Sequence, residues 1–104
     1  MRKVQVLVNQ SLAGLLWEDE TGYHFSYDSI YLSQSHATAV SVSLPLQYET
    51  YHAEQLFPFF DGLIPEGWLL DIAQKNWKIN PRDRMGLLMV ACKDCIGNVS
   101  IVVN

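Results

Sequence analysis

Apolar and polar residues alternate along the first quarter of the chain, and this alternation predicts strands with one buried face. The predicted strands are Val4–Val8, Leu12–Glu18 and Tyr23–Tyr27. The segments between them, Asn9-Gln10-Ser11 and Asp19-Glu20-Thr21-Gly22, are polar and typical of tight turns, and Gly22 can adopt a positive φ. The opening third is therefore predicted to be an antiparallel meander.

A fourth strand is predicted at Ala39–Leu46, where apolar residues again alternate with serines. The apolar face of this strand would consist of Val40, Val42 and Leu44. Pro45 has no amide proton for a ladder, so its position indicates an edge strand or a strand end. The following segment, Gln47–Gln55, is polar and is predicted to be a loop.

Helical patterns then replace the alternation. Pro58 is predicted to begin a short helical turn carrying three large apolar side chains, because its fixed φ suits the first position of a helix. A second helix is predicted over about Pro65–Lys78, with an apolar stripe on one side. A third is predicted with Asn80 as its N-cap and Pro81 in its first turn, ending near Lys93.

The last apolar run, Asn98–Val103, predicts a strand that returns to pair with the first sheet. Four strands followed by helices and one further strand predict an α+β fold, a small antiparallel sheet or barrel-like meander with two to three helices packed on one side. The 104 residues are 49% hydrophobic, which is enough for one domain over residues 1–104 with its own core.

Charge narrows the classes of function. The formal net charge is −4, and the seven Lys and Arg residues are spread along the chain, so direct contact with nucleic acid is not expected. No apolar segment is long enough to span a bilayer, and the apolar run after Met1 stops at Asn9, too early for a signal peptide. We expect a cytoplasmic protein without a membrane partner.

The cysteines and histidines do not predict a metal or cofactor site. Cys92 and Cys95 form one Cys-x-x-Cys pair, and the sequence offers no second pair of ligands at the spacing of a structural zinc site. The three histidines, His24, His36 and His52, lie far from the cysteines and from one another. The thiols are interpreted as reduced cysteines, and His24, which alternates out of the aromatic face of its strand, is expected at the surface.

The segment Phe57–Trp68 combines large apolar residues with two prolines, two glycines and two carboxylates. Such a backbone is strongly restricted, so its aromatic groups are held in place and lose little entropy when they dock on another protein. On a helical wheel Trp68 falls on the polar side, so it either packs locally or anchors a partner, and both interpretations stay open. Trp17 and Trp77 follow the apolar pattern and are predicted to be core residues.

Asp61 and Glu66 in this segment suggest an acid–base pair, but a simpler interpretation exists. Asp61 can cap backbone amides, and Glu66 would lie in a first helical turn, where the helix dipole favours a carboxylate. No nucleophile, histidine or phosphate-binding loop accompanies them in the sequence. The residues therefore predict a binding or regulatory module rather than an enzyme.

Five segments together resemble the N-terminal subdomain of HipA-type toxin kinases. They are Val8–Leu16, Ser41–Leu46, Phe59–Gly67, Asp83–Leu88 and Asp94–Val99. The Phe-Phe-Asp-Gly-Leu-Ile-Pro-Glu-Gly segment is the most specific of them. Asn98 departs from the pattern, because the family commonly has alanine there.

The resemblance also implies a function and partners. HipA kinases continue into a catalytic region, whereas a free-standing copy of this subdomain resembles the HipS antitoxins of HipBST toxin–antitoxin systems. That resemblance implies an antitoxin that docks on a HipT-like Ser/Thr kinase toxin and neutralises it, with a HipB-like DNA-binding protein in a ternary complex. The predicted partner-binding residues are Phe59, Phe60, Asp61, Leu63, Ile64, Glu66 and Trp68, with Trp68 as the inserted anchor.

Two other functions stay open. The domain could be a structural subdomain that completes a split HipA-like kinase without inhibiting it. An enzyme that uses Asp61 and Glu66 is the more remote alternative. The resemblance implies no cofactor.

Overall fold

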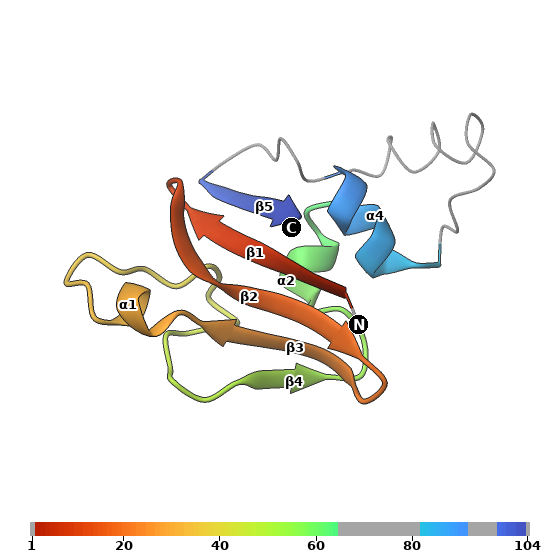
Figure 1. Ribbon diagram of the computed structural model, residues 1–104, viewed down its shortest axis with the longest axis horizontal. Helices are drawn as coiled ribbons and strands as arrows, with labels where there is room; N and C mark the ends of the chain where they lie inside the picture. The colour runs from red at the N-terminus through yellow and green to blue at the C-terminus, as the bar shows by residue number, and fades with distance from the viewer. Residues whose placement is uncertain (1, 65–81, 92–97, 104) are drawn as a thin grey trace.

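The computed structural model describes residues 2–64, 82–91 and 98–103. Its centre is a five-stranded antiparallel sheet with the strand order β4-β3-β2-β1-β5 (Figure 1). The strands are β1 (Arg2–Val8), β2 (Ser11–Asp19), β3 (Gly22–Tyr27), β4 (Tyr51–Ala53) and β5 (Val99–Val103). The helices in the described part are α1 (Ser29–Leu32), α2 (Pro58–Asp61) and α4 (Arg84–Ala91). The predicted α+β class is confirmed.

The meander forms because its turns suit the twist of the strands. Asn9 and Gln10 have φ values of 51° and 70°, so a two-residue turn of left-handed conformation joins β1 to β2. Gly22 begins β3 with a φ of 129°, which a side chain would strain. The predicted strands in this third of the chain are confirmed, and β5 pairs with β1 as expected.

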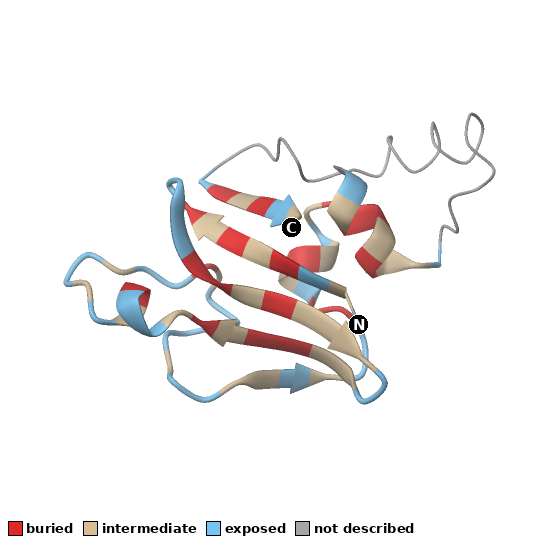
Figure 2. Cartoon of the chain, viewed as in Figure 1, coloured by how far each residue is buried: buried red, intermediate tan, exposed pale blue. Residues whose placement is uncertain are grey.

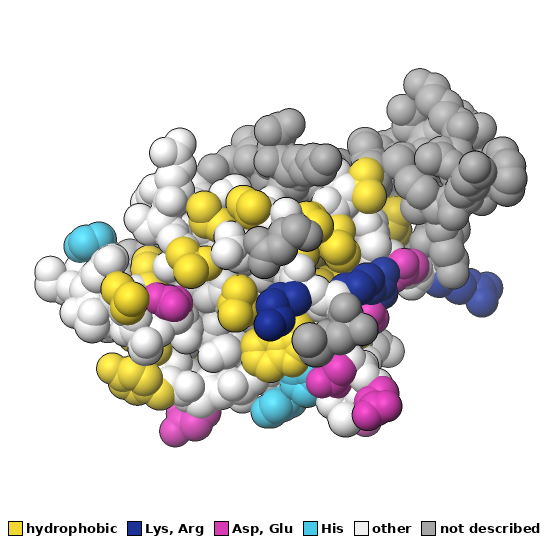
Figure 3. All heavy atoms as spheres, viewed as in Figure 1, with side chains coloured by type: hydrophobic (Ala, Val, Ile, Leu, Met, Phe, Trp, Pro, Cys, Tyr) yellow, Lys and Arg dark blue, Asp and Glu magenta, His cyan; other side chains and the backbone are white. Residues whose placement is uncertain are grey.

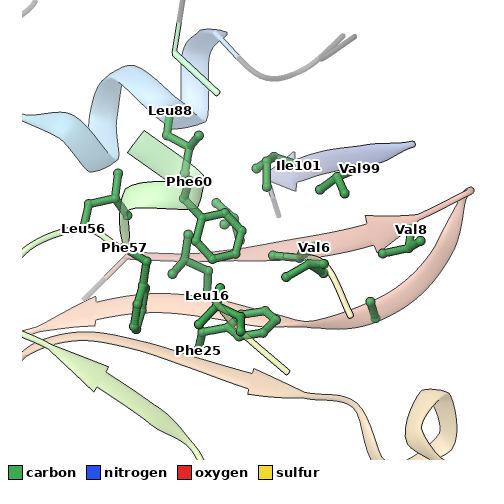
Figure 4. Packing of buried hydrophobic residues seen from close by; sticks show 14 of the residues in the cluster. Val6, Val8, Leu16, Phe25, Leu56, Phe57, Phe60, Leu88, Val99 and Ile101 are labelled. Carbon is green, nitrogen blue, oxygen red and sulfur yellow. The ribbon is translucent and has the colours of Figure 1, made fainter. Parts of the chain in front are cut away.

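One face of the sheet packs against α2 and α4 and forms the core (Figures 2 and 4). Alternate residues of β1, β2, β3 and β5 point to this face, as the period of two requires. Those that are at most 2% exposed are Val4, Val6, Ala13, Leu16, Phe25 and Ile101. Phe60 of α2 and Met85, Leu87 and Leu88 of α4 are also nearly inaccessible and close the core from the helical side.

The predicted strand at Ala39–Leu46 is wrong. The segment makes a tight turn closed by a single bridge between Ser41 and Leu44, and Val42 at its tip is 99% exposed. Tyrosine hydroxyls satisfy the backbone that a ladder would otherwise pair. The Tyr27 hydroxyl accepts from Val40 N at 3.0 Å and donates to the Leu44 carbonyl.

Two more tyrosines hold the same region. The Tyr31 hydroxyl, from α1, donates to the carbonyl of Thr38 at 2.7 Å and accepts from its amide at 3.0 Å. Tyr51 donates to the carbonyl of Pro45 at 2.6 Å. Because Tyr51 lies in β4, the prediction that Gln47–Gln55 is entirely loop was also wrong.

One helix boundary and two burial predictions need correction. The described helix α4 begins at Arg84, three residues later than predicted, because the Asp83 carboxylate accepts from Gly86 N at 3.2 Å and caps it there. His24 is only 7% exposed, although it was predicted at the surface. Trp17 is half-buried on the same outer face as His24, not in the core.

Candidate partner-binding site

The predicted binding segment enters through α2, a single helical turn that the sequence fixes at both ends. Phe57 precedes the helix with a φ of −53° and a ψ of 135°, Pro58 occupies the first turn, and Gly62 ends the helix with a φ of −69°. The amides of Asp61 and Gly62 donate to the carbonyls of Phe57 and Pro58 at 3.0 and 2.9 Å. The proline removes an amide that would have no partner, so this short turn forms despite its length.

Helix α2 and the residues after it divide into a buried side and a half-buried side. Phe60 is 0% exposed and Ile64 4%, and Phe60 packs against Phe25 of β3 with ring centroids 5.4 Å apart. Phe59 and Leu63 are half-buried at the rim of the core. Phe60 and Ile64 therefore position the segment. Pro58 is exposed and Phe59 and Leu63 are partly exposed, so these apolar side chains keep surface for a partner.

The carboxylate of Asp61 already has a partner in this chain. Arg84 Nε donates to its Oδ1 at 2.5 Å, which ties α2 to the start of α4. Both side chains are about a third exposed, at 40% and 32%, so the pair is screened by solvent and contributes about 0–1 kcal/mol. This contact makes Asp61 a less suitable acid–base residue, and Glu66 and Trp68 lie outside the described residues.

A second group of charges joins the sheet to α4. The Arg2 guanidinium donates to Asp83 Oδ2 and Oδ1 at 2.7 and 2.8 Å and to Glu18 Oε1 at 2.9 Å from Nε. The hydrogen bonds from Arg2 lower the pKa of Asp83, and the two carboxylates raise the pKa of Arg2. Figure 3 shows basic and acidic side chains together on this face of the molecule. The hydrogen bonds of Arg2 to Asp83 join the start of β1 to the start of α4.

The comparisons with known proteins agree with this architecture. The model of the HipA N-terminal domain family matches residues 4–102. The chain belongs to this family. An uncharacterized protein of Haemophilus influenzae is 33% identical to this HipA N-terminal domain over 101 residues, which are 97% of this chain and 92% of the relative. A solved structure of the N-terminal domain of HipA toxin superposes with a TM-score of 0.78 at 28% identity, covering 100% of this chain and 93% of that one.

The motifs that suggested the family occupy different parts of this HipA N-terminal domain. Ser41–Leu46 forms the tyrosine-held turn, and Phe59–Ile64 forms α2 and its exit. Asp83–Leu88 begins α4 and supplies the partner of Arg2. The last three residues of the Phe59–Gly67 motif and most of Asp94–Val99 lie outside the described residues, as do both cysteines. Within the described part, no helix is long and apolar enough to cross a membrane.

Sequence reasoning missed a polar cluster on the outer face of this HipA N-terminal domain. His24 and His52 are cross-strand neighbours on β3 and β4, and their Nδ1 atoms are 2.6 Å apart. His24 Nε2 lies 2.9 Å from Asp19 Oδ1, which also accepts from Thr21 N at 2.8 Å. Hydrogen bonds from Thr21 and then His24 lower the pKa of Asp19. The two histidines are 28 residues apart, and only the pairing of β3 with β4, which the sequence did not predict, brings them together.

Proposed function

We propose that this domain is an antitoxin that binds and neutralises a HipT-type Ser/Thr kinase toxin by docking on it. The observation that carries the proposal is the match over residues 4–102 to the HipA N-terminal domain family. The solved relative is the N-terminal domain of HipA toxin, and we infer from this that a domain of the family docks on the remainder of such a toxin. A partner kinase of the same type would offer the complementary surface.

The structure of α2 supports a docking role for this segment. The side chains of Phe60 and Ile64 are buried in the core, and the Asp61–Arg84 pair connects α2 to α4. Phe59 and Leu63 are therefore held in one arrangement at the rim of the core. Preorganised aromatic side chains lose little conformational entropy on binding. Steric blocking of a kinase requires no chemistry from this chain.

Trp68 completes the proposal on the evidence of the sequence alone. It follows α2 by seven residues, and on a helical wheel it falls on the polar side. Tryptophan is the residue most enriched among the residues that dominate binding energy, and truncation of such an anchor costs about 2–4 kcal/mol. In the proposed complex Trp68 inserts into the kinase, and a HipB-like DNA-binding protein joins the pair.

The experiment is inhibition of the purified neighbouring HipT-like kinase by this domain. The intact domain should abolish phosphorylation by the kinase, and Trp68→Ala should weaken inhibition by about 30-fold or more. Phe59→Ala should weaken inhibition as well, because its half-buried ring would lose contact with the kinase. Ile30→Ala is the matched control, since Ile30 is an apolar residue of α1 that is 71% exposed, and it should inhibit like the wild type.

The opposite result would support the structural subdomain instead. A domain that completes a split HipA-like kinase should raise the activity and thermal stability of its partner. If the folded intact domain leaves the kinase uninhibited at concentrations where the two proteins copurify, the antitoxin function is wrong.

A further inference from the structure

The polar cluster at the β3–β4 edge brings two imidazole rings into contact. His24 and His52 face each other across the strands, with ring centroids 4.7 Å apart and ring planes at 84°. The outer face at this edge carries both histidine side chains, and His52 is exposed to solvent whereas His24 is 7% exposed. One ring is therefore fixed inside the structure and the other can move.

The hydrogen bonds of Asp19 decide which nitrogen of His24 carries a proton. A carboxylate only accepts, so His24 Nε2, at 2.9 Å from Asp19 Oδ1, must donate its proton to that oxygen. Nδ1 of the neutral ring then carries a lone pair, and it points at His52 Nδ1. In the neutral pair His52 Nδ1 donates the proton that this contact needs.

We propose that His24 and His52 form a binding site for a divalent transition-metal ion of the Cu²⁺ or Zn²⁺ type, with both Nδ1 atoms as ligands. This inference is independent of the kinase partner. A histidine that ligates a metal usually donates its other ring N–H to a carboxylate, which fixes the tautomer and strengthens the ligand. Asp19 has this relation to His24.

The distances require only a small change at His52. A metal–nitrogen bond is about 2.0–2.1 Å, so two ligands of a tetrahedral site are about 3.3 Å apart, against 2.6 Å here. His24 is held by Asp19 and by stacking on Trp17 at 5.3 Å, so it stays in place. His52 lies on a three-residue edge strand and can turn by this amount.

The proton on His52 and the coordination positions left open by the two histidines are also accounted for. When the ion takes the lone pairs of both Nδ1 atoms, the proton of His52 moves through solvent to Nε2, so the neutral pair binds without net proton release. Within residues 2–64, 82–91 and 98–103 no group of three or more His, Cys, Asp or Glu side chains is placed to hold a metal ion. Water therefore fills the other positions, which makes this an open site. Imidazole ligands select Cu²⁺, Ni²⁺ and Zn²⁺ over Mg²⁺ and Ca²⁺.

Cu²⁺ is the probe, because it binds imidazole most strongly in this series and its spectrum reports nitrogen ligands. The full chain carries Cys92→Ser and Cys95→Ser in every sample, so that thiols do not capture or reduce the ion. We expect one Cu²⁺ per chain, with electron paramagnetic resonance splitting from two imidazole nitrogens. His52→Ala should remove one nitrogen and weaken binding at least 10-fold.

Two further variants separate the site from nonspecific binding. His36→Ala is the matched control, because His36 is exposed and distant from the cluster along the chain, and it should bind like the parent. Asp19→Asn should weaken binding about 10–100-fold although Asp19 is not a ligand. Equal affinity and equal nitrogen splitting in the parent and in folded His52→Ala would overturn the proposal, because the ion would then be held elsewhere.

Discussion

The side chain of Arg2 connects three segments that are far apart in the sequence. Its two carboxylate partners, Glu18 and Asp83, are 16 and 81 residues away, and Asp83 also caps α4 through Gly86. The contact is close because Gly86 has no side chain: a Cβ there would meet the Asp83 carboxylate and lie 3.2 Å from Arg2 Nη1. One guanidinium thus links the start of the sheet to the start of a helix.

The pH dependence of stability follows from this pair. Arg2 lowers the pKa of Asp83, so the stabilisation is present above the unfolded value of about 3.9 and is lost as the pH falls through the folded pKa. Asp83→Asn keeps the acceptor for Gly86 but loses the charge. It should lower the free energy of unfolding at pH 7 by about 1 kcal/mol or less, because the pair is about a third exposed.

Urea unfolding of wild type and Asp83→Asn at pH 7, 5 and 3 measures this effect. The difference between the two proteins should narrow below about pH 4 as Asp83 is protonated. Glu20→Gln, a change at an exposed turn residue, serves as the control and should show little difference at any pH. A difference that stays constant from pH 7 to pH 3 would mean that the ion pair is not its cause.

Gly14 shows a second residue-scale constraint. A Cβ at this position of β2 would lie inside van der Waals contact with the Ser26 carbonyl oxygen and 3.1 Å from the Phe25 ring. Backbone cannot move aside as a flexible side chain can, so Gly14→Ala should destabilise the domain by about 1–3 kcal/mol. Thermal unfolding of Gly14→Ala, compared with thermal unfolding of Gly62→Ala, tests this prediction. Gly62 is exposed with a φ of −69°, and alanine there should change stability by about 1 kcal/mol or less.

At the scale of elements, the sequence predicted those parts that local rules determine. The alternation in β1, β2 and β3 and the proline at the start of α2 act over a few residues, and these elements are where they were expected. Ala39–Leu46 has the same alternation, but two tyrosine hydroxyls, from β3 and β4, bond its backbone instead. A third, from α1, bonds Thr38 just before it. No window of local sequence contains that information.

The candidate partner-binding site was likewise only partly predictable from local sequence. The apolar character of Phe59 to Ile64 was evident in the sequence, but which side chains face the core depends on the sheet beneath them. Phe60 and Ile64 are buried by contacts with other elements, and Asp61 is paired by an arginine 23 residues away. The role of the segment in partner binding stays a prediction.

A substitution at Tyr27 tests whether its hydroxyl holds the turn closed by Ser41 and Leu44. Tyr27→Phe keeps the ring but removes the hydroxyl that bonds Val40 N and the Leu44 carbonyl, so two backbone groups beside the core lose their partner. Leaving them unpaired should cost about 1–3 kcal/mol. Hydrogen exchange should show faster exchange at Val40 in the variant, whereas Tyr48→Phe, at a residue 74% exposed, should leave it unchanged. Unchanged protection at Val40 in Tyr27→Phe would contradict this role of the hydroxyl.

At the scale of the whole molecule, the two ends of the chain meet in the sheet. Residues of β1 pair with residues of β5 about 90–100 positions later, for example Val4 with Val103 and Val8 with Val99. The meander of β1, β2 and β3 joins residues that are close in sequence, so its loops close at low entropic cost. Pairing of β5 must close most of the chain, and we expect it to form late in folding.

This order predicts how substitutions divide between folding and unfolding rates. Ile101→Ala should destabilise the domain by about 2–5 kcal/mol, because its side chain is 2% exposed in the core. If β5 pairs after the transition state, most of that loss will appear as faster unfolding with little change in the folding rate. Leu16→Ala, in the meander, should instead slow folding.

Stopped-flow kinetics in urea distinguish the two cases. Val102→Ala is the matched control in the same strand, since Val102 is 41% exposed, and it should change either rate little. If Ile101→Ala slowed folding as much as Leu16→Ala does, β5 would already be paired in the transition state. The closing of the sheet by the chain's last described strand would then begin folding rather than complete it.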